Sequence, residues 1–137
     1  MFAEIFPVTT RNPAVLRVLI VDDEPLIRWS LAETLAEMGH VVVEAGDGAS
    51  AIRALDDGEP FDAVVLDYRL PDSNDLNLLT TIRQIAPQAA VIMMTAFGTA
   101  EVTSGAIKLG AYRVVPKPFE MHDMAELVLQ ATAPSPS

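Results

Sequence analysis

The chain has 137 residues, of which half are apolar and a fifth are charged, and this balance predicts one soluble domain with a full hydrophobic core. Nineteen acidic against nine basic residues give a formal net charge of −10, which argues against direct nucleic-acid binding by this domain, since such binding relies on clustered cations. The absence of cysteine excludes disulfides and thiolate chemistry, and no apolar run approaches the ~18–20 residues of a membrane helix, so we expect a cytoplasmic protein without membrane contact.

The two ends of the chain differ in composition from the middle. Residues 1–14 contain two prolines and no signal-peptide pattern, which predicts a disordered leader. Residues 132–137 are small and rich in Pro and Ser, as is typical of a flexible tail or a linker stub. Residues 15–131 are therefore expected to form the folded domain.

Five short apolar runs rich in β-branched residues predict strands at 17–21, 41–45, 62–66, 90–94 and 112–115. Amphipathic segments predict helices near 25–38, 47–57, 75–86, 99–109 and 120–131. The first helix is expected to bury one face, formed by Ile27, Leu31, Leu35 and Met38.

Strict alternation of strand and helix predicts a parallel sheet with helices on both faces. The right-handed crossover rule leaves few topologies for five such units. The favoured one is an open doubly wound α/β fold of flavodoxin type, with five parallel strands in the order 2-1-3-4-5 and five helices on two faces. In such sheets, ligands bind outside the carboxyl ends of the strands.

Polar residues follow four of the predicted strands at the point where each ends. Asp22 and Asp23 follow the first strand, Asp67 the third, Thr95 the fourth and Lys117 the fifth. Each alone has a simpler explanation, such as a helix cap, a turn residue or a solvated lysine. At matching ends of neighbouring strands, however, they together predict one site.

Three carboxylates at one edge of a sheet predict a metal ion. Two unit charges ~4 Å apart repel by about 4 kcal/mol at an effective dielectric of ~20, and one lysine cannot neutralise three acids. Oxygen ligands favour Mg²⁺ or a similar hard ion such as Mn²⁺, whereas the two histidines, His40 and His122, lie far from the strand ends, which disfavours zinc. An ion next to a lysine and a threonine suits the binding of a phosphoryl group.

Four stretches, "LIVDDEP", "VVLDYRLPD", "MMTAFGT" and "PKPFE", together resemble the receiver domain of two-component response regulators, from about residue 16 to 131. Their sequences are most similar to those of receivers attached to NtrC-like transcription activators. The resemblance implies that Asp67 takes a phosphoryl group from a sensor histidine kinase or a phosphotransfer protein. It also implies that Asp23 and Asp67 hold Mg²⁺ directly, that Asp22 acts largely through water, and that the backbone carbonyl of Arg69 completes the ligands.

The resemblance further implies that Thr95, the backbone amide of Ala96 and Lys117 bind phosphoryl oxygens, and that the Lys117–Pro118 peptide is cis. Phosphorylation would draw Thr95 inward and reshape the face made by the fourth helix, fifth strand and fifth helix. A homodimer through this face is a further expectation.

Two positions depart from the family pattern. Val114 stands where an aromatic switch residue is usual; Tyr112, on the same strand face, is either a partial substitute or an ordinary packed strand aromatic. Asp75 stands where glycine is usual, which predicts an altered loop with its chemistry retained, and "PDSNDL" still indicates a turn into an N-capped helix. Arg69 and Phe97 occupy positions that tune the lifetime of the phosphate across the family.

On the first helix, Trp29 and Leu26 point away from the buried face. They form either a shielded surface pair or a docking patch for the kinase or phosphotransfer domain.

Three other functions are compatible with the predicted fold. An FMN binder needs a Ser/Thr/Gly-rich loop after the first strand, where "DDEPLIR" places acids. An aspartyl phosphatase typically needs a second Asp two residues after the first, and that position is occupied by Arg69. The strongest alternative is a degenerate receiver that acts as a phosphorylation-independent interaction module. The intact acids, Thr95 and Lys117 argue against it, and Val114 keeps it open.

Overall fold

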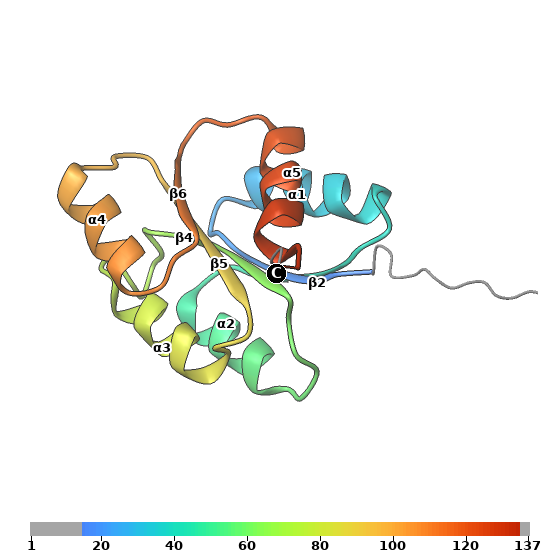
Figure 1. Ribbon diagram of the computed structural model, residues 1–137, viewed down its shortest axis with the longest axis horizontal. Helices are drawn as coiled ribbons and strands as arrows, with labels where there is room; N and C mark the ends of the chain where they lie inside the picture. Colours follow the sequence, from blue (N-terminus) through green and yellow to red (C-terminus); the bar gives the residue numbers. More distant parts are fainter. Residues whose placement is uncertain (1–14, 135–137) are drawn as a thin grey trace, which may run out of the picture.

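The structure, a computed structural model, describes residues 15–134; the predicted leader 1–14 and residues 135–137 of the predicted tail lie outside the described residues. Strands and helices alternate as predicted, each within two residues of its expected bounds (Figure 1). In chain order they are β2 Arg17–Val21, α1 Pro25–Glu37, β3 Val41–Ala45, α2 Gly48–Asp56, β4 Ala63–Asp67, α3 Asn77–Ile85, β5 Ala90–Thr95, α4 Ala100–Lys108, β6 Arg113–Pro116 and α5 Met121–Thr132.

The five strands form one parallel sheet in the spatial order β3-β2-β4-β5-β6. Numbered along the chain this is the order 2-1-3-4-5, so the predicted doubly wound fold is confirmed. The central strand β4 reads AVVLD and is buried along its whole length, as expected for a parallel strand covered on both faces. β3 and β6 are the edges of the sheet and are only partly buried.

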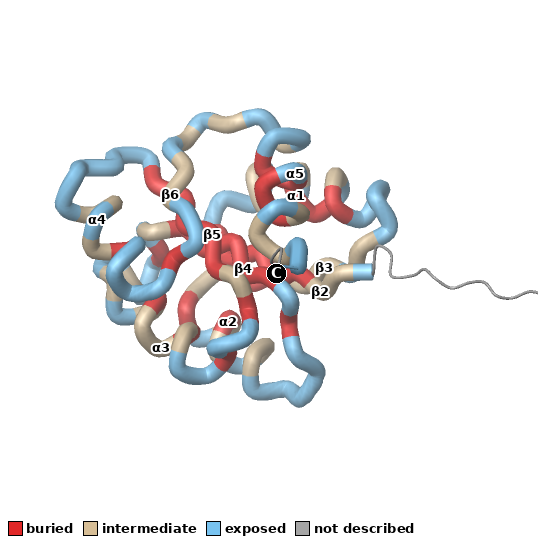
Figure 2. The backbone as a smooth tube through the Cα atoms, in the orientation of Figure 1, coloured by how far each residue is buried: buried red, intermediate tan, exposed pale blue. Residues whose placement is uncertain are grey.

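Helices cover the sheet in two layers, α1 and α5 on one face and α2, α3 and α4 on the other (Figure 1). Alternate residues of β2 divide between the layers: Val18 and Ile20 pack with α1 and α5, and Leu19 and Val21 pack on the opposite side. The buried backbone is concentrated in the sheet between the layers, and exposed residues gather on the outer helix faces and loops (Figure 2).

The buried face of α1 differs from the prediction at its last position. Leu31 and Leu35 are fully buried and Ile27 is half-buried, but Met38 is 38% exposed. Met38 is the C-cap residue and lies outside the last helical turn, and Gly39 follows with φ +95°, a conformation that glycine adopts readily. The chain therefore leaves the helix before Met38 can continue its apolar stripe.

None of the helices in residues 15–134 combines the length and the apolar composition that crossing a membrane requires.

Candidate functional site

The polar residues that end four neighbouring strands meet at one edge of the sheet. Asp22 and Asp23 follow β2, Asp67 ends β4, Thr95 ends β5, and Lys117 follows β6. Asp22 and Thr95 are buried although polar, and Asp67 is only 6% exposed. Parallel strands bring these positions together because their carboxyl ends share one edge.

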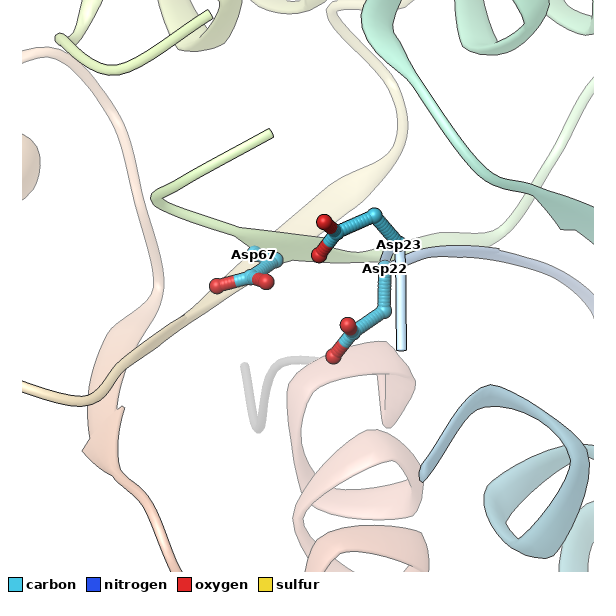
Figure 3. Close-up of side chains that lie close together, drawn as sticks. All are labelled: Asp22, Asp23 and Asp67. Carbon is cyan, nitrogen blue, oxygen red and sulfur yellow. The ribbon is translucent and has the colours of Figure 1, made fainter. Parts of the chain in front are cut away.

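Three carboxylates form an acid cluster, shown in Figure 3. One oxygen each of Asp22, Asp23 and Asp67 lies within 4.8 Å of the other two. Asp23 is exposed to solvent, and the other two point inward from the strand ends. The set is all-oxygen and strongly negative, so its chemistry fits a hard divalent cation such as Mg²⁺ or Mn²⁺.

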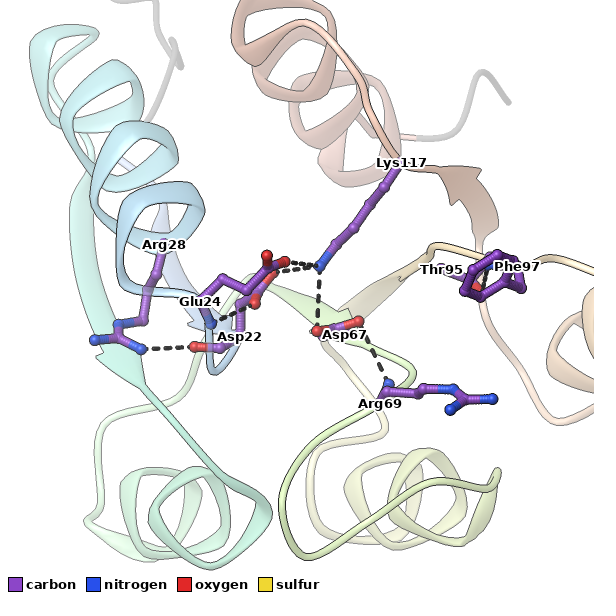
Figure 4. A network of polar contacts seen from close by, with 8 residues as sticks. All are labelled: Asp22, Glu24, Arg28, Asp67, Arg69, Thr95, Phe97 and Lys117. Atoms are coloured by element: carbon purple, nitrogen blue, oxygen red, sulfur yellow. Dashed lines mark hydrogen bonds and ion pairs between the residues drawn. The ribbon is translucent and has the colours of Figure 1, made fainter.

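Lys117 brings its ammonium into this cluster (Figure 4). Its Nζ donates to Asp22 Oδ2 at 3.0 Å, to Asp67 Oδ2 at 3.2 Å and to Glu24 Oε1 at 3.0 Å. Its backbone N–H donates to the carbonyl of Thr95 at 2.8 Å, and the Lys117–Pro118 peptide is cis, as predicted. Three carboxylates contact the one ammonium and Asp23 adds a fourth to the site, so the site keeps a negative charge that a divalent cation can offset.

The environment changes the acid–base properties of both partners. Burial, followed by repulsion from Asp22, raises the pKa of Asp67 to about 6, against the attraction of Lys117. Burial alone would lower the pKa of Lys117, but its hydrogen bonds to Asp22 and Glu24 and the nearby charges raise that pKa. Lys117 is therefore charged at neutral pH, and Asp67 is poised to gain or lose a proton in mildly acidic solution.

Sequence reasoning missed two residues that hold Asp22. Glu24 donates its backbone N–H to Asp22 Oδ1 at 2.9 Å, besides accepting from Lys117. The Arg28 guanidinium donates to the carbonyl of Asp22 at 2.6 Å (Figure 4). It also donates to Glu44 Oε1 at 3.0 Å, and so links α1 and β3 to the residues that follow β2. The available signal was that Arg28 is the single basic residue of the α1 sequence.

Thr95 uses its hydroxyl locally. Its Oγ1 accepts a hydrogen bond from the backbone N–H of Phe97 at 3.2 Å, and among the residues described it makes none with Asp67. The Phe97 side chain is exposed. Ala96 lines a pocket in front of Asp67. The other residues that line this pocket are Asp23, Glu24, Asp67, Arg69, Leu70, Pro71 and Lys117.

Arg69 and Asp75 belong to the loop between β4 and α3. The backbone N–H of Arg69 donates to Asp67 Oδ1 at 3.4 Å. Asp75 Oδ1 accepts from the N–H of Asn77 at 2.9 Å, but the N-cap residue of α3 is Leu76, which makes no side-chain cap. The expected N-capped helix is therefore wrong in detail, because the Asp75 carboxylate binds the first helical amide rather than the second or third.

At the predicted switch positions, Val114 is half-buried and packs against the core beneath α2, α3 and α4. Tyr112 directly precedes β6 and is 43% exposed, with Arg113 Cζ 5.7 Å from its ring centroid. This exposure does not fit a packed strand aromatic. The idea that Tyr112 partly substitutes for the usual aromatic stays a prediction.

Trp29 and Leu26 are both exposed on α1, Trp29 to 57%. The predicted apolar pair is therefore present on the surface of α1, the helix that follows Asp22 and Asp23.

The chain is similar to known proteins in sequence and in fold. Residues 18–129 match the family of response regulator receiver domains. The chain is 39% identical over 115 residues to the response regulator protein PilR of Pseudomonas aeruginosa, a match that covers 84% of this chain and 26% of PilR. It is 33% identical over 114 residues to the DNA-binding transcriptional regulator NtrC of Azospirillum brasilense, covering 83% of this chain and 24% of NtrC.

A crystal structure of a CheY-like response regulator receiver domain protein from Methanospirillum hungatei has the same fold. It superposes with a TM-score of 0.80 at 26% identity and covers 85% of this chain and 93% of that chain. The chain spans about a quarter of the length of the two curated relatives named above.

Proposed function

The chain belongs to the response regulator receiver family, as the sequence resemblance predicted, and on that premise we propose that Asp67 accepts a phosphoryl group from a sensor histidine kinase or a phosphotransfer protein. One observation carries the proposal. The Asp67 carboxylate ends the central strand, buried, with the Lys117 ammonium on one oxygen and the carboxylates of Asp22 and Asp23 beside it. A carboxylate so placed can act as a nucleophile, while the groups around it handle charge.

In the transfer step, a carboxylate oxygen of Asp67 forms a bond to the phosphorus of a phosphohistidine donor. The P–N bond breaks, and the imidazole nitrogen takes its electron pair and afterwards a proton from water. Asp67 must be ionised to attack, which holds for most molecules at neutral pH with a pKa of about 6. Positioning and charge neutralisation supply most of the rate enhancement in such transfers.

We propose that Asp22, Asp23, Asp67 and the backbone carbonyl of Arg69 hold Mg²⁺ or Mn²⁺. The ion, when bound, offsets negative charge at the phosphoryl oxygens. The Lys117 ammonium, already 3.2 Å from Asp67 Oδ2, can move from that oxygen to one on phosphorus. Lys117 would then pair with the phosphoryl group on Asp67 instead of with the free Asp67 carboxylate.

The output of the site is proposed to be a change of shape. The Thr95 hydroxyl would leave the N–H of Phe97 and, with the amide of Ala96, bind a phosphoryl oxygen. That movement would reshape the surface of α4, β6 and α5, and a homodimer could form through the same surface. Because NtrC is described as a DNA-binding transcriptional regulator, we infer that this receiver also controls transcription through a partner or another domain.

We propose residues 15–131 as the receiver domain, flanked by a leader and a tail, acting in the cytoplasm. The exposed pair Trp29 and Leu26 is proposed to contact the phosphoryl donor. Trp29→Ala should then be phosphorylated normally by acetyl phosphate but slowly by the histidine kinase. Normal rates with both donors would dispose of the docking role.

The phosphoacceptor proposal is tested with acetyl phosphate and Mg²⁺, followed by intact-protein mass spectrometry. Wild type should gain the mass of one phosphoryl group, and Asp67→Asn should gain none. Beryllofluoride, which mimics a phosphoryl group, should shift the amide signals of Thr95 and Ala96 in wild type only. If wild type gains no mass and shows no shift, the chain is instead a phosphorylation-independent interaction module, the alternative that Val114 keeps open.

A further inference from the structure

The loop after Asp67 contains a tight turn, residues 70–73, that separates two pockets. The N–H of Leu70 donates to the carbonyl of Ser73 at 2.7 Å, and the N–H of Ser73 donates back to Leu70 at 3.2 Å. Leu70 is buried in the core. Leu70 and Pro71 line the pocket in front of Asp67 and also a second pocket between this loop, α2 and α3. The turn is therefore the wall that these two pockets share.

Asp72, in the same turn, reaches across to the first residues of α2. Its Oδ1 accepts from the N–H of Gly48 at 2.8 Å, and its Oδ2 accepts from the N–H of Ala49 at 3.0 Å. These amides have no partner inside the helix, and a helix N-terminus favours a negative charge. A Cβ at residue 48 would lie 3.1 Å from Asp72 Oδ1 and 3.3 Å from Leu78 Cδ2, so glycine allows this close approach.

Helix α2 already has its own cap. Asp47 Oδ1 accepts from the N–H of Ser50 at 2.8 Å, and the Ser50 side chain reaches back to the N–H of Asp47, which completes a capping box. The contacts from Asp72 come instead from a residue 24 and 23 positions away in the sequence. Their distinctive effect is to fix the turn against the helix.

We propose that Asp72 is a positioning residue for the phosphoacceptor site, an inference that rests on the function proposed above. By holding the turn against α2, Asp72 fixes the direction of the backbone at Arg69 and the wall that faces Asp67. Arg69 directly precedes the turn, its N–H points to Asp67 Oδ1, and its carbonyl is the proposed metal ligand. Without the Asp72 carboxylate, the turn gains freedom and these backbone groups lose their fixed orientation.

The chain offers a matched control. Asp72→Ala and Asp47→Ala each remove one carboxylate that binds the N-terminus of α2, with the same change in net charge, but only Asp72→Ala releases the turn. Asp72→Asn keeps one acceptor oxygen and should fall between Asp72→Ala and wild type. Melting temperatures are measured first, so that each comparison is made where all the proteins are folded.

Three quantities are then compared in the full chain: backbone amide exchange at Leu70 and Ser73 without metal, Mg²⁺ affinity by calorimetry, and the phosphorylation rate with acetyl phosphate. Asp72→Ala should speed the exchange, weaken Mg²⁺ binding by roughly tenfold and slow phosphorylation, as is typical when a support of a metal ligand is lost. Asp47→Ala should leave all three close to wild type.

Equal effects of Asp72→Ala and Asp47→Ala would overturn the positioning role, as would unchanged Mg²⁺ affinity in Asp72→Ala. Amide exchange and Mg²⁺ binding do not require phosphorylation. Failure of wild type to be phosphorylated would therefore overturn the proposed function without altering this comparison.

Discussion

Lys117 Nζ lies 3.2 Å from Asp67 Oδ2, although 50 residues separate the two in the chain. The sheet makes this possible, because β4 and β6 flank β5 and end at the same edge. The pair places a permanent cation beside the group proposed to become more negative on phosphorylation. The ammonium and the carboxylate are both largely shielded from water, so each charge is stabilised mainly by its charged and hydrogen-bonding neighbours, the other among them.

Replacing Lys117 by Met should destabilise the metal-free protein. The change leaves Asp22 and Asp67 buried without their cation, which typically costs about 3–5 kcal/mol of unfolding free energy when one partner of a buried pair is lost. Mg²⁺ should restore part of this loss. Urea unfolding with and without Mg²⁺ measures both effects. The control Lys108→Met removes an exposed lysine at the end of α4 and should cost no more than about 1 kcal/mol.

The contribution of Asp67 to the free energy of unfolding of the metal-free protein should fall as the pH rises from about 4 to about 6. The pKa of Asp67 is raised to about 6 in the folded chain from 3.8, so the folded state binds more protons in this window. The stabilisation is fully present below the lower value and is lost above the upper one, an effect of up to about 3 kcal/mol. Urea unfolding of wild type and Asp67→Asn across this range tests it. As the pH rises, the free energy of unfolding of wild type should fall relative to that of Asp67→Asn. A constant difference between the two free energies would contradict the raised pKa.

Asp23→Asn should raise the melting temperature without metal, because it relieves repulsion within the acid cluster. With Mg²⁺ the advantage should shrink or reverse, since wild type then gains binding energy that the variant lacks. Differential scanning calorimetry with and without Mg²⁺ measures the change. The control Glu33→Gln removes one negative charge from an exposed position on α1. Its melting temperature should stay close to that of wild type with and without Mg²⁺. The same melting temperature for Asp23→Asn and wild type in both conditions would mean that the three acids do not interact.

Tyr112→Ala should reduce the amide shifts that beryllofluoride produces in α4, if Tyr112 carries part of the role of the missing aromatic at Val114. Tyr112 directly precedes β6 and is 43% exposed. Two-dimensional amide spectra before and after addition of beryllofluoride measure the response. Arg113→Ala, which removes the cation near the ring, serves as a control. Full-sized shifts in Tyr112→Ala would end the substitution hypothesis.

The sequence was sufficient for the parts of the molecule that depend on periodicity. Apolar runs and alternation predict the strands, and crossover rules leave few sheet orders, of which the favoured one is the one found. That order brings Asp22, Asp67 and Lys117 to one edge. Contacts of side chains with backbone groups of other elements could not be predicted. That Arg28 binds the carbonyl of Asp22, or that Asp72 binds the amides of α2, depends on rotamers and on loop paths that no local pattern encodes.

The acidic residues and the lysine of the site extend from strands that differ in burial and in hydrogen-bonded neighbours. The acids extend from β2 and β4, which are paired on both sides, whereas Lys117 extends from β6, an edge strand that is only partly buried. Edge strands open at lower free energy than central ones. Transient opening of β6 would therefore move the Lys117 ammonium away while the carboxylates stay in place. During that time the site could still bind a cation but could not bind an anion through Lys117.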